Sequence, residues 1–212
     1  LLQSQTGSYV PVKQMEKRLS RQLSSEIGIA GTMLRKNPEL LTTLNQGITF
    51  REMKPAQMLN TLQQKIQADF PSLTDVTFEL RTVHDSMKDY LSPAFYLTPP
   101  MDTGTPNVIY INPAASYQGL ELFTTLAHEG FPGHLYQTVT FERQNPSGIR
   151  NLLCTSGFAE GWATYIEPFA YQYAAGYIKD PSATELARIS WLNRSINLCM
   201  YSLLDIEIHY NG

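Results

Sequence analysis

The sequence has little charge, few cysteines and no long apolar run. Only 17 % of its 212 residues are charged, the net charge is −3, and Lys and Arg form no cluster, which argues against nucleic acid as a partner. No apolar stretch approaches the ~20 residues of a membrane-spanning helix, so we expect no membrane span. Cys154 and Cys199 stand 45 positions apart on apolar segments, where two thiols are more often separate core residues than a pair.

The ends of the sequence also lack the marks of a complete chain. It begins without Met and without a basic-then-apolar signal pattern, and it stops where a helical pattern has hardly finished. We therefore expect a piece of a longer protein, with any export signal or lipoprotein anchor in a segment that precedes it. The compartment stays open.

Apolar spacing predicts a mainly α-helical fold with a small antiparallel β-sheet. Steps of three and four residues predict helices at 10–34, 38–44 and 55–69, from 117 through the following motif, and at 156–173 and 182–209. Alternating or short apolar runs predict strands between about 75 and 112. We expect a helical N-terminal segment (1–70) and a metal-binding region with the sheet and three long helices (71–212), together in one structural domain.

The segment HEGFPGH, residues 128–134, carries the strongest chemical signal. His128 and His134 offer two neutral nitrogen ligands, and Glu129 offers an acid–base group, as in hydrolytic zinc sites. The usual motif, H-E-x-x-H, puts both histidines on one helical face. Here the second histidine follows after six residues. Because six residues turn about 240°, an unbroken helix would point the two rings apart.

Pro132 and Gly133 offer a way to bring the rings together. Pro132 cannot donate to the carbonyl of His128, and Gly133 permits an unusual backbone angle. Two residues bulged out of the helix would restore the spacing that a metal needs. The alternative is a plain helix end with solvated histidines, but the apolar helical pattern continues after the break.

A third ligand is expected from the segment SGFAEGWATYIEP. Glu160 follows His134 by 26 residues on the next predicted helix, and Glu167 lies seven residues further on nearly the same face. One carboxylate could bind a metal while the other orients a histidine. The alternative is a solvated stripe. Apolar and aromatic neighbours argue against it, because a buried carboxylate without a metal or cation costs several kcal/mol.

Three motifs in this order resemble one bacterial family. The segments AHEGFPGH, AEGWATYIE and LLDIEIHYNG are similar to domain of unknown function 885, whose pattern is H-E-G-x-P-G-H, E-G-W-A-x-Y-x-E and D-x-G-I-H. The resemblance covers about residues 75–212. That family in turn resembles zinc metallopeptidases of the gluzincin type, such as carboxypeptidase Taq and the thimet oligopeptidases, which have a largely helical, zincin-like architecture around a cleft.

This resemblance implies roles for five residues. It matches His128, His134 and Glu160 to the ligands of one zinc ion. It also matches Glu129 to the general base and His209 to the histidine of the final motif.

The last predicted helix indicates a role for His209 independently of the family. Tyr201, Asp205 and His209 follow one another at four-residue steps, so one face presents a phenol, a carboxylate and an imidazole. Asp205 could orient His209 as a proton donor or oxyanion stabiliser. The alternative is a surface pair near a helix C-terminus, where His is common. Two departures from the family lie here: Glu207 replaces its usual Gly, and the chain ends where the family continues with Trp.

Together these patterns predict a zinc-dependent metallopeptidase that hydrolyses peptide bonds with metal-activated water. Another divalent ion could replace zinc, because imidazole and carboxylate ligands accept several. Two alternatives stay open: a metal-dependent hydrolase of non-peptide amides or esters, and a non-catalytic binding module with a structural metal site. The carboxylate next to His128 favours catalysis, since a purely structural site needs no base.

Overall fold

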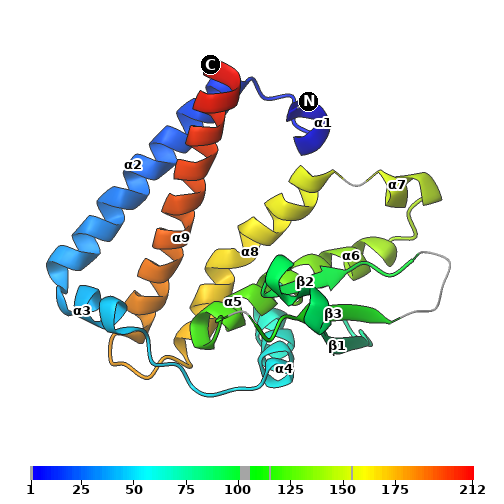
Figure 1. Ribbon diagram of the computed structural model, residues 1–212, viewed down its shortest axis with the longest axis horizontal. Helices are drawn as coiled ribbons and strands as arrows, with labels where there is room; N and C mark the ends of the chain where they lie inside the picture. Colours follow the sequence, from blue (N-terminus) through cyan, green and yellow to red (C-terminus); the bar gives the residue numbers. More distant parts are fainter. Residues whose placement is uncertain (1, 101–105, 115, 154) are drawn as a thin grey trace. The chain divides into compact units, whose positions relative to one another are not determined.

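The structure, a computed structural model, describes residues 2–100, 106–114, 116–153 and 155–212 (Figure 1). The chain forms two compact units: the first comprises Leu1–Gly7 and Arg51–Ala174, and the second comprises Ser8–Phe50 and Ala175–Gly212. The helical segment expected over residues 1–70 contributes to both units, because its long helix pairs with the last helix of the chain.

The first unit combines helices with one small sheet. Its α-helices are α1 (Leu2–Thr6), α4 (Pro55–Lys65), α5 (Gly119–Glu129), α6 (His134–Glu142), α7 (Gly148–Leu152) and α8 (Ser156–Ala175, whose last residue belongs to the second unit). Two 3-10 helices, η1 (Ile66–Ala68) and η2 (Asp85–Tyr90), complete it. The predicted mainly helical character is therefore confirmed, although the helix expected through the motif is divided into α5 and α6.

The sheet is mixed, and the prediction of an antiparallel sheet is wrong. Its strands are β1 (Phe78–Thr82), β2 (Ala94–Leu97) and β3 (Asn107–Ile111), in the spatial order β1-β3-β2 (Figure 1). β3 pairs with β1 in parallel and with β2 antiparallel. Alternating hydrophobicity reports that one face is buried, but it carries no information about the direction or order of the partners. This is why the sequence predicted the strands and missed their arrangement.

Buried side chains on α5 place the motif at the edge of the core. Leu120, Phe123, Leu126 and Ala127 recur at three- and four-residue steps and are at most 8 % exposed. Beyond the break, Leu135 is fully buried on α6. The two helices are therefore held by packing on both sides of the motif, which fixes the directions in which its histidines leave the backbone.

The second unit is a helical pair with a short helix at one end. It contains α2 (Val12–Lys36), α3 (Glu39–Gln46), α9 (Ala183–Ile206) and the π-helix η3 (Glu207–Asn211). α2 and α9 run antiparallel side by side (Figure 1), and hydrogen bonds join Ser195 to buried Glu26 and Asn37 to Ser182.

Two further predictions from the sequence concern the cysteines and the absence of a membrane span. Cys199 is a free, buried thiol on α9, whereas Cys154 lies outside the described residues. No helix in the described part of the chain is both long and apolar enough to cross a membrane.

Candidate metal centre

The backbone between the two histidines contains the two-residue bulge that the sequence predicts. α5 ends at Glu129 and α6 begins at His134, with a cis peptide bond between Phe131 and Pro132. The N–H of Gly133 donates to the carbonyl of Ala127 (3.0 Å), six residues back, and Tyr136 donates to Gly130 (3.1 Å) with the same spacing. A regular helix bonds four residues back. These two hydrogen bonds span six residues where a helix spans four, so the segment contains two more residues than a regular helix would. The regular pattern resumes in α6.

Gly133 is required by this bulge. A Cβ atom built on it would lie 1.7 Å from the carbonyl oxygen of His128 and 2.5 Å from that of Ala127. Both obstacles are backbone atoms, which cannot move aside as the end of a side chain can. Any side chain at this position would therefore disturb the segment that aims His134.

We expect Gly133→Ala to lower the free energy of unfolding by at least about 3 kcal/mol, the upper range for overpacking, because the new methyl group meets backbone on two sides. Gly161→Ala on α8 is the matched control. A Cβ there meets nothing within 4 Å. That change should raise the free energy of unfolding by about 0.5–1 kcal/mol, since alanine loses less chain entropy in a helix than glycine. Urea unfolding measures both, and equal stabilities for the two variants would contradict the close approach.

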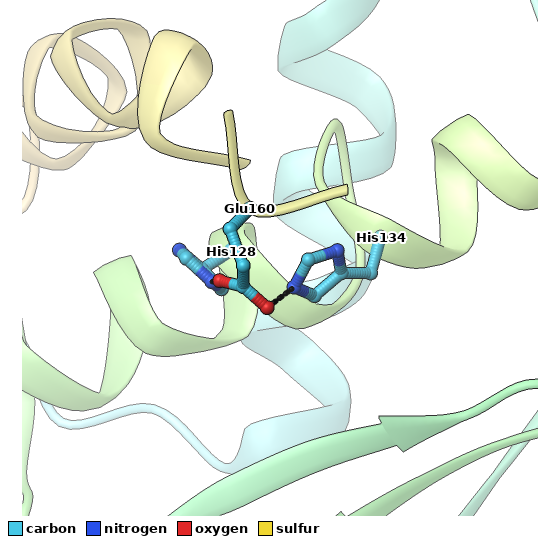
Figure 2. Close-up of side chains that lie close together, drawn as sticks. All are labelled: His128, His134 and Glu160. Atoms are coloured by element: carbon cyan, nitrogen blue, oxygen red, sulfur yellow. Dashed lines mark ion pairs between the residues drawn. The ribbon is translucent and has the colours of Figure 1, made fainter. Parts of the chain in front are cut away.

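The bulge brings two imidazoles and one carboxylate together. His128 Nε2 lies 3.5 Å from Glu160 Oε2, and His134 Nε2 lies 3.6 Å from Glu160 Oε1. One ligand atom from each of the three residues lies within 4.8 Å of the others. Figure 2 shows the carboxylate of Glu160 reaching from α8 to both rings, whose planes are 86° apart.

This donor set fits zinc. Zinc holds nitrogen and oxygen ligands at about 2.0–2.2 Å, which places the ligand atoms of a tetrahedron roughly 3.3 Å apart. The two observed nitrogen–oxygen separations, each to a different oxygen of Glu160, are only a few tenths of an ångström longer. One ligand atom from each residue gives a set that spans up to 4.8 Å, so the three side chains would draw closer together around an ion. Two imidazoles and a carboxylate also suit other divalent ions of the first transition series. The three residues named as ligands from the sequence are thus the three that the structure brings together.

The two glutamates of α8 differ in how far their side chains are buried. The side chain of Glu167 is 4 % exposed, whereas that of Glu160 is 64 % exposed. Aromatic neighbours on the same helix are exposed as well, with Phe158 at 63 % and Tyr165 at 60 %. The sequence argument from the cost of a buried carboxylate therefore applies to Glu167 and not to Glu160, because α8 is not surrounded by protein on every side.

Glu167 contacts the far nitrogen of His128. Its Oε1 lies 3.3 Å from Nδ1, so the two carboxylates of α8 flank one imidazole ring. With Nδ1–H donating to Glu167, the lone pair of Nε2 faces Glu160. Burial lowers the pKa of His128, but the hydrogen bond to Glu167 and the surrounding carboxylates outweigh burial and raise the pKa overall. The carboxylates around His128 therefore favour its protonated form, and the ring must lose that proton before Nε2 can bind a metal.

His134 has the opposite shift. Burial lowers its pKa, the charge of His128 lowers it further, and Glu160 only partly compensates. A lowered pKa keeps the ring neutral near pH 7, and the neutral ring is the form that binds a metal.

Glu129 extends toward the sheet, where a backbone amide holds it. The N–H of Tyr96 on the edge strand β2 donates to Glu129 Oε2 (2.9 Å). Burial raises the pKa of the Glu129 carboxyl, and the charge of Glu160 adds to this, while the Tyr96 amide and the adjacent imidazole act in the opposite direction. Sequence reasoning missed Tyr96 as a contact of this residue, because a backbone N–H belongs to almost every residue and leaves no signal in the sequence.

His209, Asp205 and Tyr201 belong to the second unit. His209 Nδ1 lies 3.1 Å from Asp205 Oδ1, with side chains that are 72 % and 70 % exposed, and Tyr201 is also 70 % exposed. The predicted carboxylate–imidazole pair is therefore present, and it has the exposed character of the surface alternative. His84, the other remaining histidine, accepts the N–H of Ser86 at the start of η2.

A comparison with solved structures supports this fold. The crystal structure described as that of the putative lipoprotein from Colwellia psychrerythraea has a TM-score of 0.76 and 17 % identity to this chain. The match covers 99 % of this chain and 39 % of that one, so the chain spans less than half the length of this relative. No curated protein matches the chain.

A family comparison covers nearly the whole sequence. Residues 16–212 match the model of the family described as "Bacterial protein of unknown function (DUF885)". The matched range includes all three motifs and every residue of the candidate metal centre. The chain therefore belongs to the bacterial DUF885 family.

Proposed function

We propose that this chain carries the metal centre of a metallopeptidase, in which His128, His134 and Glu160 bind one zinc ion. The observation that supports this most is the convergence of these three side chains, from α5, α6 and α8, with ligand atoms within 4.8 Å of one another. Two histidines separated by six residues would diverge on a regular helix. Their convergence requires a dedicated bulge, and a solvated helix end would have no need of one.

The bound ion would supply a water of pKa about 7 and polarise the peptide carbonyl. Glu129 would act as the base that takes a proton from the attacking water and passes it to the leaving nitrogen. Burial raises the pKa of this carboxyl above its ordinary value, and a base of higher pKa holds the transferred proton more firmly. The Tyr96 amide keeps the carboxylate oriented while it does so.

The exposure of Glu160 favours a catalytic over a structural centre. Structural zinc sites usually have four protein ligands and are closed, whereas catalytic sites have three and keep one position for water or substrate. Among the described residues, the group that could hold a metal comprises three side chains, and the carboxylate among them is 64 % exposed. An open approach suits a chain-like substrate such as a peptide. Glu167 would orient His128 without binding the metal itself.

Two further assignments go beyond the geometry of the metal centre. His209 is proposed as a proton donor or oxyanion stabiliser because the sequence resemblance matches it to the histidine of the final motif, and because Asp205 lies within 3.1 Å of it. Tyr201 lies one helical turn before Asp205 on α9. Export or lipoprotein anchoring is proposed because the structural relative is described as a "putative lipoprotein".

Hydrolysis of a substrate panel by the zinc-loaded protein tests this function. We expect release of amines from a mixed peptide library, loss of that release after treatment with a chelator, and recovery when zinc is added. Aryl esters and non-peptide amides in the same panel test the alternative chemistry. Turnover of these compounds without any cleavage of peptides would replace the peptidase by an amide or ester hydrolase.

A further inference from the structure

Trp162 contacts the bulge from the same helix that carries Glu160. Its indole N–H donates to the carbonyl oxygen of Pro132, at 2.8 Å. Pro132 lies between the two histidines, in the segment between the end of α5 and the start of α6. Residues two apart on a helix point about 200° apart. Glu160 and Trp162 therefore leave α8 on different sides, and each of them contacts a different part of the motif.

The carbonyl of Pro132 needs such a partner. Pro132 is buried, and it stands where the helical pattern between α5 and α6 is interrupted. The neighbouring carbonyls of Gly130 and Gly133 accept bonds from the backbone of α6, at Tyr136 and Gln137. A buried carbonyl left without a donor destabilises the conformation that buries it. The indole N–H supplies the donor, so it favours the bulged backbone over other paths between the helices.

Aromatic packing fixes the position of the indole. The Trp162 ring stacks on Tyr136, with centroids 6.3 Å apart and planes at 7°, and it meets Phe70 edge-on at 6.1 Å. Tyr136 lies on α6, two residues after His134. The indole of Trp162 thus contacts the bulge through Pro132 and α6 through Tyr136. These contacts join α8, the bulge and α6.

We propose that Trp162 is a positioning residue for the metal centre: its N–H holds the Pro132 carbonyl and thereby keeps His134 facing His128 and Glu160. This inference rests on the proposed metal centre and adds to it a residue that binds neither metal nor substrate. Outer partners of metal sites are typically worth about 10–100-fold in metal affinity.

The test compares Trp162→Phe with Tyr136→Phe. The hydroxyl of Tyr136 donates to the carbonyl of Pro71 at 2.8 Å. Each variant therefore lacks one side-chain donor to a proline carbonyl, and the two aromatic rings that carry these donors stack on each other. Of these two side-chain donors, the indole N–H of Trp162 bonds to a carbonyl of the bulge and the hydroxyl of Tyr136 does not. Zinc affinity of the metal-stripped proteins is measured by competition with a chromophoric chelator, and their melting temperatures are measured without metal. We expect zinc to bind about 10–100-fold more weakly to Trp162→Phe and with unchanged affinity to Tyr136→Phe.

A second replacement separates the hydrogen bond from the packing. Replacing Trp162 by β-(3-benzothienyl)alanine exchanges the N–H for sulfur and keeps the shape of the ring, so it decides the matter if Trp162→Phe does not fold. It too should weaken zinc binding. Wild-type affinity in the benzothienylalanine variant, whatever Trp162→Phe shows, or an equal loss in Tyr136→Phe, would overturn the inference and leave the metal centre standing. If the wild-type protein itself does not bind zinc, the proposed function fails and this inference fails with it.

Discussion

Replacement of Glu129 by glutamine is expected to lower kcat for peptide hydrolysis by about 10²–10⁴-fold, the usual contribution of general acid–base catalysis, with zinc content unchanged. The amide keeps the size of the side chain and an oxygen that can accept the Tyr96 N–H, but it cannot take a proton from water. Initial rates at saturating peptide, together with zinc content by elemental analysis, measure both expectations.

Glu121→Gln is the control for this prediction. Glu121 is an exposed carboxylate on the same helix, α5, so its replacement changes the net charge by the same amount without touching the metal centre. Its rate should equal that of the wild type. Peptide hydrolysis by Glu129→Gln at the wild-type rate would remove Glu129 from the mechanism and with it the assignment of the site as hydrolytic.

His134→Ala should abolish stoichiometric zinc binding. The variant keeps His128 and Glu160 as ligands, and two protein ligands hold zinc poorly. The loss of affinity should exceed about 100-fold, since even partners outside the ligand set are worth about 10–100-fold. Elemental analysis after dialysis should find about one zinc per wild-type chain, as expected of a single site, and close to none per variant chain.

An exposed histidine of the same unit provides the comparison. His84 caps the 3-10 helix η2 by accepting the N–H of Ser86, and it lies outside the ligand group. His84→Ala should therefore retain the full zinc content. Equal zinc content in His134→Ala and the wild type would mean that the metal binds elsewhere, and the proposed centre would be wrong.

The chemical part of the site could be predicted from the sequence because residue type and order carried it. His128, Glu129, His134 and Glu160 were named from their spacing and from the family motifs. Pro132 and Gly133 even predicted the kind of distortion, since proline lacks the N–H that a helix needs and glycine tolerates close backbone contact. These are local consequences of covalent structure, which a sequence contains in full.

Other features depend on contacts between distant segments and could not be predicted in this way. The parallel pairing of β1 and β3, the Tyr96 amide on Glu129 and the pairing of α2 with α9 all join residues far apart in the chain. The burial of Glu167 and the exposure of Glu160 differ although the two share one helical face, because burial depends on what packs against each turn. Periodicity along a single segment does not contain this information.

Trp162 shows how a residue's chemistry can be present in the sequence and still be overlooked. It is one of the aromatic neighbours of Glu160 on α8, and the size of its ring favours an apolar role. Its indole N–H, however, is a donor that finds a partner whenever the ring is largely buried. The Pro132 carbonyl, freed from the helical pattern by the bulge, is that partner. The sequence contains the donor, but which carbonyl accepts it depends on how α8 packs against the motif, 30 residues away.

The most direct test of the central claim is an anomalous-diffraction map at the zinc absorption edge, from crystals of the zinc-loaded protein. The account predicts one peak bound by Nε2 of His128, Nε2 of His134 and a carboxylate oxygen of Glu160, each at about 2.0–2.2 Å, with no fourth protein ligand. A peak at another place, or one enclosed by four protein side chains, would contradict it.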